Sequence, residues 1–442
     1  MFKRKIYDCL LEWKKSSDGR TALLIEGARR IGKSTVVESF ARNEYESYIL
    51  IDFAKASKET KDLFEDVSNL NYIFLQLQLI YGVDLHERKS VIIFDEVQLC
   101  PNARQAIKTL VQDHRYDYIE TGSLISIKKN VMNILIPSEE RKLSMYPMDY
   151  EEFLWALGDT TTIPILKKCF SENIGLGEKM NRKLLRDFRL YMLIGGMPQA
   201  VDEYIRTNNF KYVDQVKRDI LHLYEDDFMK IDPTGRISML FDAIPAQLNK
   251  NAARYQAASV LGGESSDKIL ELIAELKDSK TVLVSYHAND PDVGMANSKD
   301  LYRFKLFLCD TGLFTTMMFK DSDFTDNVIY EKLLSDKLSV NLGYLYENIV
   351  AQTLAANGNE LFYYTMYNES SKHNYEIDFL ITRKNKICPI EIKSSGYKTH
   401  KSLDVFTHKY CNRILQRYLI YTKDFAKDTD ILCLPIYMAQ FL

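Results

Sequence analysis

Apolar and polar positions along the first 150 residues change in the way that alternating strands and helices require. Short apolar runs predict four strands, which are TALLIEG (21–27), SYILIDF (47–53), VIIFDE (91–96) and YDYIETGS (116–123). Ile6, Leu10 and Trp13 recur at helical spacing before the first strand. A second helix is expected from about Lys33 to Arg42. Because strands alternate with helices and VIIFDE is almost wholly apolar, we predict an α/β fold with a doubly wound parallel sheet.

Helical periodicity dominates the middle of the chain. It runs from Met180 to Lys230 and is interrupted by Ile-Gly-Gly-Met-Pro at 194–198, which most simply marks a helix break. From Ile237 to Cys309 we expect three short helices, the strand TVLVSY, a polar loop and the strand YRFKLFLCD. Three helices followed by a two-stranded hairpin are the pattern of a winged helix.

The last hundred residues are typical of one helix followed by strands. The helix is expected from about Asn341 to Ala356. The strands are LFYYTM (361–366), YEIDFLIT (375–382) and ICPIEIKSS (387–395). A chain of 442 residues is long for a single core, so these segments are expected to form two to four domains.

Composition narrows the class of protein only a little. With 46% hydrophobic and 27% charged residues it is ordinary for a globular protein, and a net charge of −3 means that a nucleic-acid partner would need a local basic surface. The seven cysteines are scattered without a zinc spacing, which favours a reducing compartment. The N-terminus has no signal-peptide core, and the most apolar stretch (72–81) is far shorter than the roughly 20 residues of a membrane span. We therefore expect a soluble, cytoplasmic protein with no membrane partner.

A phosphate-binding loop follows the first predicted strand. Residues 27–34, GARRIGKS, match the pattern G-x-x-x-x-G-K-[ST] between a strand and a helix. Gly27 and Gly32 let the backbone curl so that its N–H groups point at phosphate oxygens, while the helix N-terminus adds partial positive charge. Lys33 is expected to reach the β- and γ-phosphates, and the Ser34 hydroxyl to ligate Mg²⁺. The pattern predicts a site for ATP with Mg²⁺.

Asp95 and Glu96 end the apolar strand VIIF downstream of this loop. Asp95 is expected to hold magnesium, and Glu96 to orient and deprotonate the attacking water. Two adjacent acids at a strand end also occur in solvated turns, but the position downstream of the loop favours the catalytic interpretation. The residues expected to contact the nucleotide or its magnesium are Gly27, Ala28, Arg29, Arg30, Ile31, Gly32, Lys33, Ser34, Thr35, Asp95, Thr121 and Ser123.

Two further groups near this site have more than one interpretation. Thr121 and Ser123 lie where a hydroxyl could contact the γ-phosphate or the water, or could cap the next helix. Arg115 and Arg141 are candidates for an arginine that compensates transition-state charge, and either is also an ordinary surface residue.

The last hundred residues carry an acidic constellation. Glu391 and Lys393 lie two positions apart on one predicted strand, so they project from the same face. Asp378 lies on the preceding strand, and the turn RKNK can make the two strands neighbours. Glu347 lies on the predicted helix, and Glu376 shares a strand face with Asp378. This is the arrangement of PD-(D/E)xK nucleases.

In such a site Asp378 and Glu391 would bind Mg²⁺ with Glu347 as a further ligand, and the ion would activate water for phosphodiester cleavage. Lys393 would stabilise charge or position the nucleophile. Charged residues that alternate with apolar ones also occur on any half-exposed strand, and many domains with this fold cleave nothing. An active nuclease and an inactive scaffold both stay open.

The middle segment carries sequence signals both for and against DNA binding. Its predicted recognition helix (265–277) carries Lys268 among acidic residues, whereas DNA-reading helices present Arg, Lys, Asn or Gln. Lys250 and Arg254 with Tyr255 form a better set for phosphate contacts. A DNA-binding and a purely structural winged helix are both consistent with the pattern.

The motifs GARRIGKST, IIFDEVQ, TGSL and MYPMDYEEFL are followed by YMLIGGMPQAV, LYEDDFMKI, LCDTGLF, EIDFLI and PIEIKSS. In this order they resemble AAA-type ATPases of bacteria and archaea that carry a C-terminal domain of unknown function. We expect four regions, which are an AAA-like P-loop core (1–165), a helical lid (166–235), a winged-helix-like segment (236–330) and a restriction-endonuclease-like, nuclease-like domain (331–442). Many relatives show Gly-Arg where this chain has Glu140-Arg141, which argues against a trans-acting Arg141.

Two hypotheses about function follow. The favoured one is an ATP-driven machine that acts on nucleic acid, DNA before RNA, through its nuclease-like domain. The competing one is a nucleotide-gated switch or interaction protein whose C-terminal domain is an inactive scaffold. Because AAA-like cores often work as rings, a homo-oligomer also stays open.

Overall fold

The computed structural model describes residues 1–122, 138–250, 253–320, 327–335, 343–368, 373–394 and 397–442. They form two compact units. The first unit consists of residues 1–146 and 278–280, and the second of residues 147–277 and 281–442. Each unit is built around a sheet of its own, and among the described residues no helix is long and apolar enough to cross a membrane.

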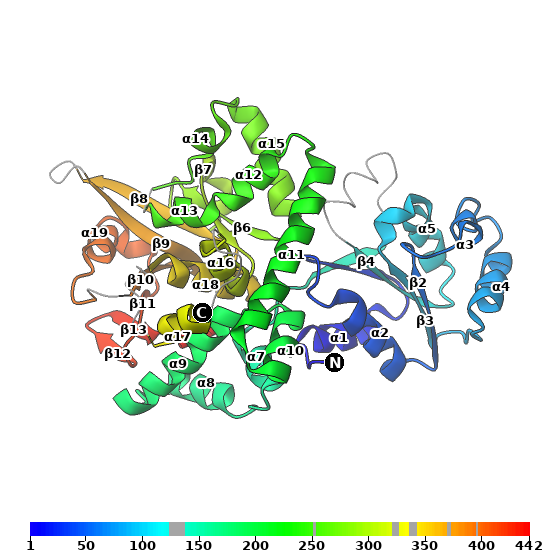
Figure 1. Cartoon of the computed structure of the whole chain (residues 1–442), viewed down its shortest axis with the longest axis horizontal. Coiled ribbons are helices and arrows are strands. Elements are labelled where there is room, and N and C mark those ends of the chain that lie inside the picture. Colours follow the sequence, from blue (N-terminus) through cyan, green and yellow to red (C-terminus); the bar gives the residue numbers. More distant parts are fainter. Residues whose placement is uncertain (123–137, 251–252, 321–326, 336–342, 369–372, 395–396) are drawn as a thin grey trace. The chain divides into compact units, whose positions relative to one another are not determined.

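Five parallel strands form the sheet of the first unit, in the order β2-β3-β4-β1-β5. Figure 1 labels β2, β3 and β4 of this sheet. Their bounds are β1 Ala22–Glu26, β2 Ser47–Asp52, β3 Ser90–Asp95, β4 Asp117–Gly122 and β5 Glu140–Ser144. The predicted parallel sheet is therefore confirmed, with all four expected strands in it. The fifth strand, β5, was not expected because its sequence ERKLS lacks an apolar run, and it is held by backbone pairing to β1.

Helices flank this sheet. They are α1 Ile6–Ser17, α2 Lys33–Glu44, α3 Lys58–Asp62, α4 Leu70–Tyr81 and α5 Pro101–Gln112, with a short 3₁₀ turn at Val97–Leu99. One continuous core joins the inner faces of α4 and α5 to β2 and β3, with Phe53, Phe64 and Phe94 in edge-to-face or tilted contact. Asn69 accepts a hydrogen bond from Tyr72 N–H and so begins α4.

The second unit opens with a helical region and has further helices between the strands of its sheet. Its helices are α7 Tyr150–Ala156, α8 Thr162–Glu172, α9 Glu178–Ile194, α10 Pro198–Thr207, α11 Phe210–Ile231, α12 Arg236–Asp242, α13 Ile244–Asn249, α14 Ala257–Leu261, α15 Ser266–Asp278, α16 Thr311–Met318, α17 Asn327–Leu334, α18 Gly343–Ala356 and α19 Lys401–Tyr410. The predicted helical stretch from Met180 to Lys230 is confirmed, and its break falls between α9 and α10 as expected.

Tight backbone packing explains this break. Gly196 N–H donates to Asp310 Oδ2 at 2.6 Å, and Asp310 Oδ1 also accepts from Leu313 N–H and begins α16. A Cβ atom at Gly196 would lie 2.0 Å from the Met148 carbonyl oxygen, so no larger residue fits. The motifs LIGGMP and LCDTG therefore hold α9, α10 and α16 together.

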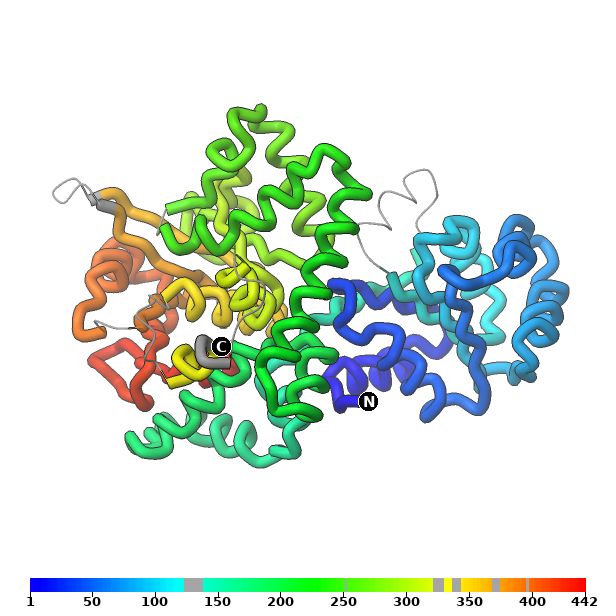
Figure 2. The backbone as a smooth tube through the Cα atoms, in the orientation of Figure 1, coloured from blue at the N-terminus to red at the C-terminus, as the bar shows by residue number. Residues whose placement is uncertain are grey.

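The second unit also contains a mixed eight-stranded sheet, in the order β12-β13-β11-β10-β9-β8-β6-β7. In the backbone tube its segments run from the yellow-green part of the chain to the red C-terminal part (Figure 2). The bounds are β6 Val282–Ala288, β7 Lys299–Leu308, β8 Phe362–Asn368, β9 His373–Arg383, β10 Lys386–Lys393, β11 Arg417–Tyr421, β12 Ala426–Asp428 and β13 Ile431–Pro435. The three C-terminal strands expected from the sequence are confirmed. Helix α18 packs against β6, β7 and β10, and α19 against β9 and β10.

The hairpin expected in a winged helix is present as β6 and β7, but it belongs to this larger sheet. Strand β6 pairs with β7 on one side and in parallel with β8 on the other. Four helices, α12 to α15, precede the hairpin instead of the expected three. The apolar pattern runs on from α12 into α13, and Pro245 at the start of α13 marks the division. The four-region division stays a prediction.

Candidate functional site

The loop after β1 has the curled backbone that a phosphate-binding loop requires. Arg30 and Gly32 have φ values of 67° and 92°, in the left-handed region. A Cβ atom on Gly27 would lie 2.3 Å from the Met145 carbonyl oxygen, so the loop must be glycine at this point. Helix α2 begins directly after Gly32, so its N-terminal N–H groups lie at the loop.

Lys33 lies inside this loop. Its ammonium donates to the carbonyl oxygens of Gly27 at 3.0 Å and Ala28 at 2.8 Å. Burial lowers the pKa of Lys33 to about 8, an effect that the negative charges of Glu96 and Asp95 oppose. The ammonium is thus held by neutral oxygens, and an anionic ligand would stabilise its charge.

Three oxygen-bearing side chains meet at the ends of α2, β3 and β4. Ser34 Oγ donates to Asp95 Oδ1 at 2.7 Å, and Thr121 Oγ1 donates to the same oxygen. Hydroxyl and carboxylate oxygens are the ligands that Mg²⁺ prefers, so Ser34 and Asp95 fit the expected ion. The contact also gives Thr121 a structural position beside the site, while its role toward nucleotide stays a prediction. Ser123 lies outside the described residues.

Glu96 follows Asp95 at the end of β3. Its backbone adopts a left-handed conformation with φ of 53°, and its carboxylate accepts a hydrogen bond from Gln98 Nε2. A non-glycine residue with positive φ is uncommon and often occurs at functional sites. The structure therefore brings Lys33, Ser34 and Asp95 together. Glu96 directly follows Asp95 in the chain.

Two buried arginines have roles that the sequence did not indicate, one at the loop and one between α5 and the sheet. Arg4 donates to the carbonyl oxygens of Ile31 at 2.8 Å and Tyr146 at 2.7 Å, and so braces the loop. Arg104 pairs with Glu120 at 2.9 Å and with the Glu140 carboxylate at 2.6 Å. The sequence analysis predicted no helix around Arg104, and its place on the buried face of α5 is seen only in the structure.

The two surface arginines weighed as charge-compensating residues have ordinary partners. Arg115 pairs with Asp113 at 2.6 Å and donates to Asn71 at 2.7 Å. Arg141 is exposed and donates to Ser16 Oγ at 3.3 Å. Neither contact indicates a catalytic role, which stays a prediction.

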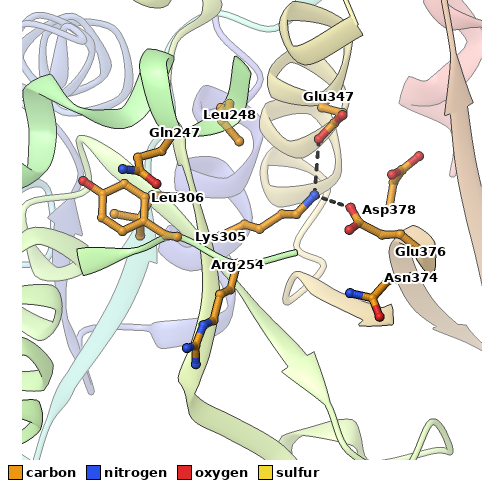
Figure 3. A pocket seen from close by; sticks show the side chains of 10 residues that line it. Gln247, Leu248, Arg254, Lys305, Leu306, Glu347, Asn374, Glu376 and Asp378 are labelled. Atoms are coloured by element: carbon orange, nitrogen blue, oxygen red, sulfur yellow. Dashed lines mark hydrogen bonds and ion pairs between the residues drawn. The ribbon is translucent and has the colours of Figure 1, made fainter. Parts of the chain in front are cut away.

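Three carboxylates of the acidic constellation, Glu347, Glu376 and Asp378, line a pocket of about 240 Å³, whereas Glu391 and Lys393 are not among its lining residues (Figure 3). The lining residues are Gln247, Leu248, Arg254, Tyr255, Lys305, Leu306, Glu347, Asn374, Glu376 and Asp378. Glu347 comes from α18, and Glu376 and Asp378 from β9, as the sequence predicted. Tyr255 was expected to contact phosphate, but it is buried and donates its hydroxyl to Leu240 O at 2.6 Å.

Lys305 on β7 lies among these carboxylates, and it was not among the residues predicted for this site. Its ammonium pairs with Glu376 and lies 3.6 Å from Glu347 Oε2. Although burial opposes it, the negative charges of Glu376, Glu347 and Asp378 raise the pKa of Lys305 above its ordinary value. A single lysine within the apolar run RFKLFL was the available signal, because a buried lysine needs a partner of opposite charge.

The hairpin of β9 and β10 brings Asp378 and Glu391 to adjacent strands, as predicted. Asp378 Oδ2 accepts from Ile392 N–H at 2.6 Å, and the Glu391 carboxylate pairs with Lys393 at 2.8 Å. Burial, with the negative charges of Glu347 and Glu376, raises the pKa of Asp378 well above its ordinary value.

The expected metal ligands Glu347, Asp378 and Glu391 do not fit a metal ion in this arrangement. Lysines pair with Glu347 and Glu391, and a backbone N–H binds Asp378. Within the part of the chain that the structure describes, no three His, Cys, Asp or Glu side chains are grouped to hold a metal. The metal expected for a nuclease therefore disagrees with the charges present.

Comparisons with known domains agree with the geometry of the first unit. Residues 19–154 match an AAA domain, residues 185–323 match a domain of unknown function (DUF8612), and residues 342–438 match a second domain of unknown function (DUF4143). The first match agrees with the five-stranded parallel sheet and the loop at 27–34, so the first unit is similar to the P-loop domain of AAA-type ATPases.

Individual relatives are distant. An uncharacterized protein of Methanocaldococcus jannaschii is 22% identical over 362 residues, which are 78% of this chain and 72% of that protein. The Thermotoga maritima RuvB Holliday junction branch migration motor is 13% identical with a TM-score of 0.29, covering 64% of this chain and 89% of its own. Drosophila ORC bound to DNA is 13% identical with a TM-score of 0.26, covering 69% and 82%. The similarity of the first unit to an AAA domain therefore rests on the loop, the sheet and the domain match, and not on these proteins.

Proposed function

We propose that this chain hydrolyses ATP with Mg²⁺ at the loop of the first unit. The observation that carries the proposal is the contact between Ser34 and Asp95 at 2.7 Å, directly beside Lys33. Lys33 and the N–H groups of residues 27–34 bind the phosphates, and Glu96 orients and deprotonates water. Ser34 and Asp95 hold Mg²⁺, which when bound neutralises phosphate charge.

The use of ATP is best supported as a conformational switch. Of the two hypotheses that the sequence allows, cleavage of nucleic acid requires a metal among carboxylates that already pair with Lys305 and Lys393. The switch requires only that nucleotide changes how the second unit binds a partner. We therefore favour the switch, with a C-terminal sheet that serves as a scaffold.

The partner that we propose for the switch is nucleic acid, with DNA before RNA. A second pocket of about 380 Å³ is lined by Arg254, Gln256, Ser259 and Tyr302, among others. Tyr302 is 53% exposed, which suits stacking on a base, and the Arg254 guanidinium suits a phosphate. Both side chains lie on the second unit.

ATP turnover by the purified full chain tests the first proposal. Phosphate release is compared between wild type, Asp95→Asn and Glu96→Gln, with Mg²⁺ present and after chelation. We expect turnover in the wild type, its loss after chelation and in Asp95→Asn, and retained ATP binding without turnover in Glu96→Gln. Binding of ATP by the wild type without any turnover would overturn the proposal.

Binding of labelled DNA and RNA tests the partner. Fluorescence anisotropy is measured with ATP or ADP for wild type, Arg254→Ala and Tyr302→Ala. Lys427→Ala, which removes an exposed lysine on β12 at the sheet edge opposite β7, is the matched control. Nucleotide-dependent binding that is weakened by the first two changes and kept in the control is expected. Absence of binding under both nucleotides would remove nucleic acid as the partner.

A further inference from the structure

The acidic pocket of the second unit already contains a cation. Lys305 extends from β7 between α18 and β9, and its ammonium pairs with Glu347 and Glu376 (Figure 3). Only 7% of the residue is exposed. An unpaired ammonium in this position would be strongly unfavourable, so the carboxylates and the lysine depend on one another.

An aromatic ring adds to this arrangement. The ammonium lies 5.6 Å from the centroid of Tyr363, a residue that is fully buried. The negative face of an aromatic ring attracts an ammonium group. The cation is thus held by two carboxylates from different elements and by one ring.

We propose that Lys305 is the resident cation of this pocket and excludes divalent metal ions from it. A Mg²⁺ or Mn²⁺ ion at Glu347, Glu376 and Asp378 would lie close to the positive ammonium, and the two like charges repel. With Lys305 among them these carboxylates are not grouped to hold a metal, and once its charge is removed they are free to close on an ion with the oxygen ligands that it prefers. Removal of the lysine charge converts the pocket into a divalent cation site.

Exclusion of metal ions by Lys305 does not depend on ATP hydrolysis. It is the opposite of what a nuclease-like site requires, which is a metal held by the carboxylates. Lys393, the lysine that the sequence pattern assigns to catalysis, pairs with Glu391 on β10. Lys305 lies on a different strand and carries the counter-charge for Glu347 and Glu376. The ion pairs of the pocket then stabilise the scaffold by joining β7 to α18 and β9.

Manganese binding, followed by electron paramagnetic resonance, tests the proposal. The full chain carries Asp95→Asn throughout, so that the nucleotide site contributes no metal ligand, and no nucleotide is added. We expect no Mn²⁺ site when Lys305 is intact and one new site in Lys305→Gln, with at least about tenfold tighter binding than the parent. Adding Glu347→Gln to Lys305→Gln should abolish the new site.

Lys299→Gln is the matched control, because Lys299 lies on the same strand and pairs at 3.5 Å with Glu360 outside the pocket. It removes the same charge and should leave Mn²⁺ binding unchanged. If circular dichroism shows that Lys305→Gln does not fold, the pair Lys305→Met with Glu376→Gln, which removes one charge of each sign, replaces it and should also gain a site.

Two results would overturn the proposal. One is Mn²⁺ binding by the parent protein that Glu347→Gln abolishes, since the carboxylates would then hold metal with Lys305 in place. The other is a folded Lys305 variant that gains no site. ATP turnover of Lys305→Gln in the chain with native Asp95 is measured alongside, so that a failure of the ATPase proposal is recognised separately.

Discussion

Two buried lysines show how differently this chain uses the same side chain. Lys33 in the first unit donates to the neutral carbonyl oxygens of Gly27 and Ala28, and its pKa is lowered to about 8. Lys305 in the second unit pairs with Glu347 and Glu376, and its pKa is raised. The first ammonium donates to neutral oxygens, while Asp95 and Glu96 only partly offset the effect of its burial, so it suits an incoming anion. The second already has its counter-charges, so its pocket suits neither an anion nor a further cation.

The largest expected effect separates the two lysines by activity. Lys33→Ala should lower ATP turnover by about a hundredfold or more, because it removes a preorganised charge at the phosphates. Lys305→Gln should leave turnover within about twofold of the wild type. Steady-state phosphate release with saturating ATP measures both. Similar losses in the two variants would break the distinction between the sites.

The next effect separates them by stability. Lys305→Met should lower the free energy of unfolding by about 2–3 kcal/mol, because it leaves partly buried carboxylates without a counter-charge. Adding Glu376→Gln should recover part of the loss. Urea unfolding followed by tyrosine fluorescence measures both changes, with Lys299→Met as a control that should cost less than about 1 kcal/mol. A cost for Lys305→Met as small as the control would show that the pocket does not need the ammonium.

A third buried lysine extends the comparison to pH. Lys217 donates to the carbonyl oxygens of Leu193 and Gly312 and to Tyr330, and burial lowers its pKa to about 8. Between pH 8 and its unfolded pKa near 10.5, the unfolded chain binds more protons than the folded one, so stability relative to Lys217→Met should rise with pH. We expect a rise of roughly 1–2 kcal/mol between about pH 8 and pH 9.5 in urea unfolding. Parallel curves for the two proteins would contradict the lowered pKa.

The smallest effect concerns Lys33 itself. Because its ammonium is buried among neutral oxygens, Lys33→Met should change the free energy of unfolding by less than about 1 kcal/mol. Urea unfolding without nucleotide measures it. A loss as large as that of Lys305→Met would mean that the loop depends on the charge even without phosphate.

Most of the first unit could be predicted from its sequence. The loop at 27–34 has an internal spacing that follows from phosphate chemistry, the acids Asp95 and Glu96 end an apolar strand, and the four apolar strands are distinct. Strand β5 could not be predicted, because its polar sequence carries no period and pairing to β1 alone makes it a strand. Arg4 was missed for a similar reason, since a contact from residue 4 to residue 31 has no local signal.

The second unit shows the limit of local patterns. Strand alternation predicts that Glu391 and Lys393 share one face of a strand, and the short turn predicts that Asp378 lies on the neighbouring strand. Both arrangements are present. Lys305 reaches Glu347 and Glu376 only because β6 and β7 join the C-terminal sheet, a pairing between segments some 75 residues apart. No pattern within the hairpin indicates that partner, so the charge that decides the chemistry of the pocket could not be assigned.

The place of β6 in its sheet also affects how the chain is made. During synthesis β6 and β7 emerge well before β8, whose Phe362 pairs with Tyr286. Until then one edge of the nascent hairpin has no strand beside it, and such edges readily pair with other chains. Completion of the sheet is a non-local step that waits for β8 and β9, and Lys305 meets Glu376 only then.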